Sequence, residues 1–177
     1  MKKIIFKLAV GISLSIFSSN FALAQTCNAA VQSSAPNSRF LVNDDATVTD
    51  LNTGLIWMQC VQGLSGADCA SGTAQNLTWD LALQVPQSLN AAGGFGGSSS
   101  WRLPNYKELT SLLEIACITP AINANVFPNT PSNNFWSSTP TSQFVDYTFY
   151  VNFDTAEGAI SQRTGQLFVR LVRDSGL

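Results

Sequence analysis

Short runs of hydrophobic residues alternate with polar turns along residues 39–58. The runs are rich in β-branched and large apolar residues, and the segments between them carry Asn, Asp and Gly, which favour turns. Runs of this length bounded by turn residues are typical of β-strands. The pattern predicts three strands with the sequences RFLV, TVTD and LIWMQC, separated by the turns NDDA and LNTG.

Similar runs return after residue 133, where NFWSS, DYTFYVNF and AISQ predict a second group of strands. In residues 146–153 apolar and polar positions alternate, which predicts a strand with one buried face. That face carries Tyr147, Phe149, Val151 and Phe153, and the other carries Thr148, Tyr150 and Asn152.

The last hydrophobic run, QLFVRLVRD over residues 166–174, also alternates with period two. Its two faces differ little in hydrophobicity, apart from one arginine. We expect a strand in which Leu167, Val169 and Leu171 lie opposite Phe168, Arg170 and Val172.

Two segments between these groups have helical spacing. In the first, Trp79, Ala82, Leu83, Pro86 and Leu89 fall on one face. Thr78 can cap this helix and Asp80 lies in its first turn, where a negative charge is favourable. Because proline lacks an amide hydrogen, Pro86 is expected to kink or end the helix.

The second predicted helix begins after Asn105, which forms a capping-box pattern with Glu108 three residues later. Pro120 is expected to end it, and residues 119–134 then form a long loop rich in Pro and Asn. Strands, two helices, a loop and further strands predict an α+β domain with its helices packed on antiparallel sheets. The inward face of this helix is expected to carry Leu109, Leu112, Leu113 and Ala116.

The N-terminal residues 1–24 have the pattern of a secretory signal peptide, with lysines, an apolar stretch and Ala22-Leu23-Ala24 before Gln25. The apolar stretch is shorter than the roughly 20 residues that a membrane-spanning helix needs. We therefore expect cleavage before Gln25, a single domain over residues 25–177, no membrane span after cleavage, and a secreted or periplasmic protein.

Charge excludes one class of partner. Residues 25–177 carry 6 Lys and Arg against 11 Asp and Glu, because three of the nine basic residues lie in the predicted leader. Proteins that bind nucleic acids hold the phosphates chiefly with Lys and Arg. The net charge of −5 therefore indicates no nucleic-acid partner.

All four cysteines follow the predicted leader, and an even number in an oxidising compartment favours two disulfides. Four cysteines allow three pairings. The short loop between Cys60 and Cys69 makes a local bridge plausible, which leaves Cys27 and Cys117 for a long-range one. Zinc is not expected, because the chain has no histidine and no Cys-x-x-Cys motif.

No cofactor or metal is expected elsewhere. Asp44, Asp45 and Asp50 resemble a calcium loop only faintly, because the glycine that such loops use is absent. Acidic residues that shape a turn are the favoured interpretation, and calcium is the alternative.

Five motifs between about residues 39 and 174 carry a resemblance to a known family: TVTDLNTGLIWMQC, WDLALQVPQSLNAAGGFGG, WRLPNYKEL, FPNTPSNNFWSSTP and FVRLVRD. In this order they are similar to the Lcl C-terminal domain family of exported bacterial proteins. The resemblance implies a C-type-lectin-like fold, with the chain ends together, two helices and a long loop region that leads into a small sheet. It also implies kinship with the formylglycine-generating sulfatase-modifying fold.

Within the WRLP motif we expect Trp101 and Leu103 to fill the core between helices and sheet, with Pro104 preceding the second helix. Arg102 is expected to be partly buried against a carboxylate or loop carbonyls, since a desolvated guanidinium without partners is costly. A catalytic arginine is the alternative.

Catalysis is not expected. Histidine, the commonest general base, is absent. Chemistry of the formylglycine-generating kind needs reactive cysteines near the C-terminal sheet, and no cysteine follows Cys117. The resemblance implies ligand binding on the long loop and adjoining strands, the surface of residues 118–147, as in an adhesion module for a glycan or protein. Its amides and aromatic rings suit neutral sugars. The residues in question are Asn125, Asn129, Asn133, Asn134, Trp136, Asp146 and Tyr147.

Three alternatives remain open. In the first, Trp136 belongs to the core, the asparagines shape turns and this surface binds nothing. In the second, the protein is a non-catalytic envelope scaffold without a small-molecule ligand. This second alternative predicts an exposed apolar patch, whereas the glycan-binding module predicts an exposed aromatic residue beside the asparagines. The third alternative is an enzyme of the formylglycine-generating-related fold.

Overall fold

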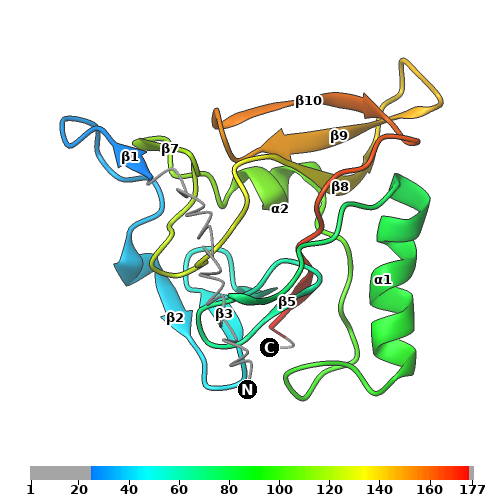
Figure 1. The fold of residues 1–177 in the computed structure, drawn as a ribbon, viewed down its shortest axis with the longest axis horizontal. Helices are drawn as coiled ribbons and strands as arrows, with labels where there is room; N and C mark the ends of the chain where they lie inside the picture. Colours follow the sequence, from blue (N-terminus) through cyan, green and yellow to red (C-terminus); the bar gives the residue numbers. More distant parts are fainter. Residues whose placement is uncertain (1–24, 176–177) are drawn as a thin grey trace, which may run out of the picture.

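Antiparallel strands dominate residues 25–175, the part of the chain that the computed structural model describes (Figure 1). The predicted signal peptide, residues 1–24, lies outside the described residues. Within residues 25–175 the structure contains no helix with the length and hydrophobicity needed to cross a membrane.

The lower sheet in Figure 1 contains the strands predicted between residues 39 and 58. All its neighbours are antiparallel, and the C-terminal strand pairs with the third of these strands, so Val172 lies opposite Trp57. The sheet therefore joins the two ends of the domain. Its strands, in spatial order, are β11 (Val172–Asp174), β4 (Leu55–Met58), β3 (Thr47–Asp50) and β2 (Phe40–Val42).

The upper sheet has the spatial order β10-β9-β8 and is also antiparallel. The prediction that β9 has a single buried face was wrong. Val151 packs in one core cluster, whereas Tyr150, on the opposite face, packs against another. The sheet consists of β8 (Asn134–Pro140), β9 (Tyr147–Asn152) and β10 (Glu157–Gln162). It therefore lies between two packed layers of side chains.

Two short antiparallel strand pairs complete the sheets. β1 (Thr26–Cys27) pairs with β7 (Cys117–Ile118), and β5 (Leu64–Ser65) pairs with β6 (Ser71–Gly72). A 3-10 turn, η1 (Asn37–Arg39), precedes β2. The disulfide Cys27–Cys117 joins β1 to β7 and Cys60–Cys69 closes the β5 loop, which confirms the pairing favoured by the cysteine spacing.

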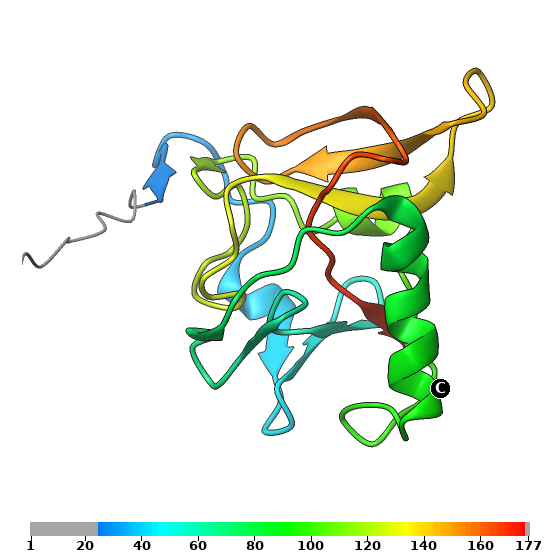
Figure 2. The ribbon, with the colours of Figure 1, turned by 45° about the vertical axis from the view of Figure 1, so that its right-hand side comes forward.

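Helix α1 (Trp79–Ala91) lies along one side of the molecule and extends from the upper sheet towards the lower one (Figures 1 and 2). Its predicted inward face is confirmed, since Ala82 is fully buried and Leu83 and Leu89 pack on the same cluster. Pro86 is buried but does not end the helix, which continues for five more residues.

Helix α2 (Tyr106–Thr110) begins with the predicted capping box between Asn105 and Glu108. It is only five residues long, so the prediction that it continues to Pro120 was wrong. The chain leaves helical geometry because Glu114 is captured elsewhere: its backbone amide donates to the Ala121 carbonyl, and its carboxylate accepts hydrogen bonds from residues 33–35.

The hydrophobic core consists of two clusters separated by the segment 167–172. Phe168 and Val172 pack in the cluster between the two sheets, and the residues that alternate with them pack in the cluster beneath α1. The predicted alternation of this segment is therefore confirmed, but the strand predicted over residues 166–174 is shorter, since only Val172–Asp174 forms β11. Two helices on antiparallel sheets form an α+β arrangement.

Two buried carboxylates predict acid sensitivity. Burial alone raises the pKa of Asp50, but hydrogen bonds from Arg39 and Thr53 outweigh it and lower that pKa below its ordinary 3.8. For Glu114, burial is likewise outweighed by hydrogen bonds from Ser33 and Ala35, which lower the pKa below 4.5. Carboxylates of this kind stabilise the fold above their unfolded-state pKa values and lose that contribution as the pH falls through the folded-state values.

We therefore expect the free energy of unfolding, measured by urea titration monitored by tryptophan fluorescence, to fall progressively as the pH drops below about 4.5. Glu114→Gln should make the decline shallower, because one of the two titrating groups is gone. A stability that stays constant between about pH 5 and pH 3 contradicts the assignment.

Candidate functional site

The structure divides the predicted ligand-binding residues among separate places. Asn134 begins β8 and lies opposite Asn152, whereas Asp146 and Tyr147 lie near the tip of the β8–β9 hairpin, where Pro140 faces Thr148. Six steps along a strand span about 20 Å. The asparagines at the start of β8 and the acidic tip of the hairpin therefore do not form one surface.

The asparagines of the long loop make contacts within the fold. The Asn129 side-chain amide donates to the Asp68 carbonyl at 2.8 Å, which ties the long loop to the Cys60–Cys69 loop. The Asn133 side chain accepts from the Asn134 backbone amide at 2.8 Å, a local contact of the turn-forming kind. Asn125 is exposed and lines a different depression, together with Gln25 near the N-terminal strand. Asn129 and Asn133 therefore have structural roles.

Trp136 is a core residue. Its side chain has no exposed surface, and its indole nitrogen donates to the Leu77 carbonyl at 2.7 Å. The prediction that Trp136 contacts a ligand was therefore wrong, because the alternation of β8 turns this ring towards α1 and away from solvent.

A depression of about 340 Å³ lies beside the tip of the β8–β9 hairpin, and we call it the hairpin-end depression. The turn after β10 is fastened to both neighbouring elements: the Arg163 amide donates to the Asp146 carbonyl at 2.8 Å, and the Trp79 amide donates to the Arg163 carbonyl at 3.0 Å. Three elements distant in sequence thus build the depression. Its lining residues are Asp80, Asp146, Gln162, Arg163 and Thr164.

The Arg163 guanidinium is held in place by an aromatic ring. Its central carbon lies 4.3 Å from the centre of the Trp79 ring, and its Nε donates to the Thr148 hydroxyl at 3.3 Å. The Trp79 indole is itself fixed, since it donates to the Ser137 carbonyl at 2.9 Å. The cation is therefore oriented before any ligand arrives.

The other polar groups of the depression face solvent. Among residues 25–175, the side chains of Asp80, Asp146 and Gln162 form no hydrogen bond or salt bridge, and all three are exposed. Two carboxylates, an amide and an oriented guanidinium thus present hydrogen-bond acceptors and donors side by side. The arrangement can hold a ligand that offers both.

An apolar tip lies next to this depression. Phe144 and Val145 are 51% and 82% exposed, and the Phe144 ring centre lies 5.4 Å from that of Tyr147. The exposed aromatic residue therefore accompanies Asp146 rather than the asparagines. Both features that were expected to separate a glycan-binding module from a scaffold, an exposed aromatic and an exposed apolar patch, occur together here.

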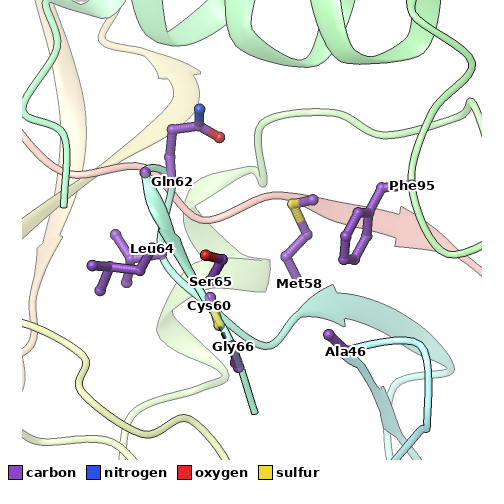
Figure 3. Close-up of a pocket in the computed structure, with 10 residues that line it drawn as sticks. Ala46, Met58, Cys60, Gln62, Leu64, Ser65, Gly66 and Phe95 are labelled. Carbon is purple, nitrogen blue, oxygen red and sulfur yellow. Dashed lines mark hydrogen bonds between the residues drawn. The ribbon is translucent and has the colours of Figure 1, made fainter. Parts of the chain in front are cut away.

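A second cavity, of about 170 Å³, lies between β4, the Cys60–Cys69 loop and the glycine-rich loop that follows α1, residues 92–100 (Figure 3). Figure 3 shows Met58 and Phe95 on one side of it and Leu64 on the other. The described walls carry no ionisable side chain, because the only cysteine among them, Cys60, is disulfide-bonded. The cavity can therefore accept only a small, largely apolar group.

Arg170 fixes one wall of that cavity from the core. It is fully buried, and its guanidinium donates to the carbonyls of Met58 and Gln59 and to the Thr130 hydroxyl. Burial lowers the pKa of Arg170 to about 9, and no carboxylate of residues 25–175 forms a salt bridge with it. This arginine acts in the fold, because no ligand in solution can reach it.

The Arg102 guanidinium forms ion pairs with two carboxylates. Its Nη atoms donate to Glu108 at 2.7 and 2.9 Å and to Asp174 at 2.9 Å, and these bonds raise its pKa despite partial burial. On either side Trp101 and Leu103 are buried in the α1 cluster, and Pro104 is buried before α2. The arrangement ties α2 to the C-terminal strand, and it matches the expectation that Arg102 is partly buried against a carboxylate.

The acidic turn of the calcium alternative does not converge on one point. Asp50 points into the core and binds Arg39, whereas Asp45 accepts hydrogen bonds from Thr47. Within residues 25–175 no three acidic, cysteine or histidine side chains gather as metal ligands. The turn interpretation accounts for these contacts.

Sequence reasoning missed Arg163, Gln162 and Thr164, and it assigned Asp80 only to a helix terminus. The sequence signal that could have identified them is weak, because a polar turn after a strand is common in any chain and does not by itself indicate a binding site. Only the pairing of β9 with β10 and the docking of α1 bring these residues together.

The depression, the cavity and both sheets lie within, or largely within, a region that a family model recognises. The model described as the Lcl C-terminal domain matches residues 46–173. No curated protein matches the chain.

Proposed function

The chain belongs to the Lcl C-terminal domain family, and we propose that it is an exported binding module that recognises a glycan through the hairpin-end depression. Two disulfides support a secreted or periplasmic location, as the predicted signal peptide does. We also propose a C-type-lectin-like fold. That proposal is supported by the lower sheet, which joins the domain ends, and by the loop that leads into the upper sheet.

One observation carries the proposal for a glycan ligand. The Arg163 guanidinium is held over Trp79, while the side chains of Asp80, Asp146 and Gln162 beside it form no hydrogen bond within residues 25–175. Sugar hydroxyls donate and accept hydrogen bonds, so they can satisfy all these groups at once. Phe144 beside the depression offers an exposed face for the C–H groups of a sugar ring.

The charge of the depression narrows the class of ligand. Two carboxylates outnumber the single guanidinium, and the described protein as a whole is acidic. Anionic sugars are therefore repelled, and neutral or amino sugars are favoured. A fixed cation, carboxylate acceptors and an amide next to an aromatic ring match such ligands better than they match a phosphate or sulfate group.

Binding is tested first on a glycan array with the oxidised protein, in calcium and then in a chelator. We expect selective binding in both conditions. Asp146→Asn should weaken the affinity about tenfold, because it replaces a charged acceptor by an amide in the depression. Isothermal titration with the best glycan of the array measures the change.

Asp44→Asn is the matched control, since it removes the same charge from an exposed aspartate in the turn between β2 and β3. It should leave both affinity and thermal stability unchanged. Equal weakening by the two variants contradicts a site at the depression. Loss of binding in the chelator contradicts calcium-independent recognition at the depression.

A second candidate function, a non-catalytic interaction domain in the envelope, is supported by the exposed Phe144 and Val145 at the hairpin tip. Absence of glycan binding, together with capture of a defined protein partner that Val145→Ser abolishes, favours it. No catalytic step is part of either proposal. All four cysteines form disulfides, which counts against the thiol chemistry of the formylglycine-generating-related fold.

A further inference from the structure

Strand β10 is the open edge of the upper sheet. Figures 1 and 2 show it at the boundary of the molecule, with β9 on one side and no described element on the other. The far edge of the same sheet is closed, because the Trp136 amide donates to the Phe168 carbonyl and the Phe168 amide donates to the Asn134 carbonyl, both at 3.0 Å. Only β10 therefore offers backbone groups of this sheet to a partner.

The ladder shows which backbone groups of β10 point outward. One step beyond the last pair of β9 and β10, the Arg163 amide donates to the Asp146 carbonyl at 2.8 Å. Hydrogen-bonded pairs alternate with non-bonded pairs in an antiparallel ladder. Every second residue counted back from Arg163 is therefore bonded to β9, and the residues whose N–H and C=O groups point away from β9 are Gly158, Ile160 and Gln162. Of these groups, the Gln162 carbonyl also accepts a hydrogen bond from the Gly165 amide at 2.9 Å in the turn after β10.

The β8 side of the sheet gives the same assignment. The Phe153 amide donates to the Asn133 carbonyl at 2.9 Å, so Val151, two residues earlier, is bonded to β8. Val151 is the residue opposite Gly158. Because its backbone groups are directed to β8, those of Gly158 have no partner on β9.

The exposed edge lacks the usual protection. Edge strands in natural proteins avoid pairing by being short or by carrying lysine, proline or a bulge. β10 is six residues long, has the sequence EGAISQ, and keeps regular register with β9 throughout. By contrast β2, at the edge of the lower sheet, has only three residues. Gly158 and Ala159 are exposed and small, so another backbone can approach closely.

We propose that β10 pairs antiparallel with β10 of a second copy of this chain, around a two-fold axis at Ile160. In this register each outward-facing residue meets an outward-facing residue: Ile160 meets Ile160, and Gly158 meets Gln162 of the second copy. A slip of one residue sets outward groups against groups already bonded to β9. A slip of two residues shortens the ladder.

Charge complementarity supports the second copy as the partner. Glu157 and Arg163 are the only charged residues from 157 to 163, and the two-fold register places each of them across from its opposite in the other copy. Like charges are nowhere opposed in this ladder, which favours self-pairing. Gln162 and Arg163 also line the hairpin-end depression. The inference nevertheless does not rest on glycan binding, because the dimer is measured without any glycan present.

The interface is small. Paired edge strands alone fall below the roughly 1,200–2,000 Å² that stable complexes bury. We therefore expect a weak dimer whose population rises with protein concentration, formed by a sheet that is continuous across both copies.

Sedimentation equilibrium of the oxidised protein, from micromolar to millimolar concentration, tests the proposal. Ile160→Pro removes the outward N–H at the axis and leaves the β9 ladder intact, because that N–H does not bond β9. It should raise the dimer dissociation constant about tenfold or more. Ile160→Ala is the matched control: it removes the same side chain but keeps the N–H, and should dimerise nearly as well as the parent.

Circular dichroism and thermal unfolding establish that each variant is folded. If Ile160→Pro does not fold, Glu157→Arg provides the test, because it places an arginine across from Arg163 of the second copy and should also weaken the dimer. A protein that is monomeric throughout the concentration range overturns the proposal. A dimer that neither Ile160→Pro nor Glu157→Arg weakens, although both variants fold, also overturns it. The same holds for a dimer that Ile160→Ala disrupts as strongly as Ile160→Pro.

Discussion

Asp50→Asn is expected to lower the free energy of unfolding by about 3–5 kcal/mol. Asp50 has no exposed surface and binds the Arg39 guanidinium through both carboxylate oxygens, and Arg39 itself is only 8% exposed. An asparagine keeps the size but not the charge, so Arg39 remains buried without a counterion. The same substitution weakens the hydrogen bonds that Asp50 accepts from Thr53 and from the Asn52 amide, which form the turn after β3.

Arg39 adds to the expected loss because it joins distant parts of the chain. Its guanidinium also donates to the Ser111 carbonyl at 2.7 Å, just after α2, and lies 5.0 Å from the Phe40 ring centre. A change in the position of Arg39 therefore disturbs both the lower sheet and α2. Urea-induced unfolding followed by tryptophan fluorescence measures the effect at neutral pH.

Two carboxylates provide matched controls for this prediction. Asp44→Asn, at an exposed position in the same region, should change stability by less than about 0.5 kcal/mol. Glu108→Gln weakens a half-exposed ion pair with Arg102 and the capping box, and should cost about 1–2 kcal/mol. A cost for Asp50→Asn no greater than that for Asp44→Asn contradicts the buried ion pair.

The parts of the fold that were predictable from sequence depend on neighbours in the chain. The capping box of Asn105 and Glu108 spans three residues, and the alternation within residues 167–172 follows from strand geometry. Where prediction was wrong, a distant contact decided the outcome. α2 ends early because residues 33–35 bind Glu114. β9 is covered on both faces because Tyr106 of α2 packs on Phe149 on one face, and Tyr150 packs against the α1 cluster on the other.

The candidate site shows the same limit more strongly. Asp146 was identified because it lies beside a strand, but its companions in the hairpin-end depression come from the start of α1 and the turn after β10. No local pattern connects Asp80 with Arg163, which are 83 residues apart in the chain. Composition suggested asparagine as the sugar-binding residue, yet Asn133 bonds its own turn and Asn129 ties two loops together, because asparagine side chains bond backbone groups readily.

Removal of the long-range disulfide is expected to have the second large effect. Cys27 and Cys117 are separated by 90 positions, whereas Cys60 and Cys69 are separated by nine. A cross-link stabilises mainly by restricting the unfolded chain, and more so for a longer loop. Replacing Cys27 and Cys117 by serine should lower the free energy of unfolding by about 4–5 kcal/mol, and replacing Cys60 and Cys69 by about 2–3 kcal/mol.

The folded state adds a local consequence for the first pair alone. Cys27 lies on a two-residue strand whose only described strand partner is β7. Without the bridge, residues 25–31 are held to the domain chiefly by this pairing and by the Gln25 side chain, which donates to the Pro120 and Ile122 carbonyls. Hydrogen exchange should therefore quicken at Asn28, whose amide donates to the Ala116 carbonyl, while β3 and β9 keep their protection. Urea titration of the two double variants measures the stabilities. An equal loss for both pairs, or a larger one for Cys60 and Cys69, contradicts the loop-length argument and indicates that contacts in the folded state set the stabilisation.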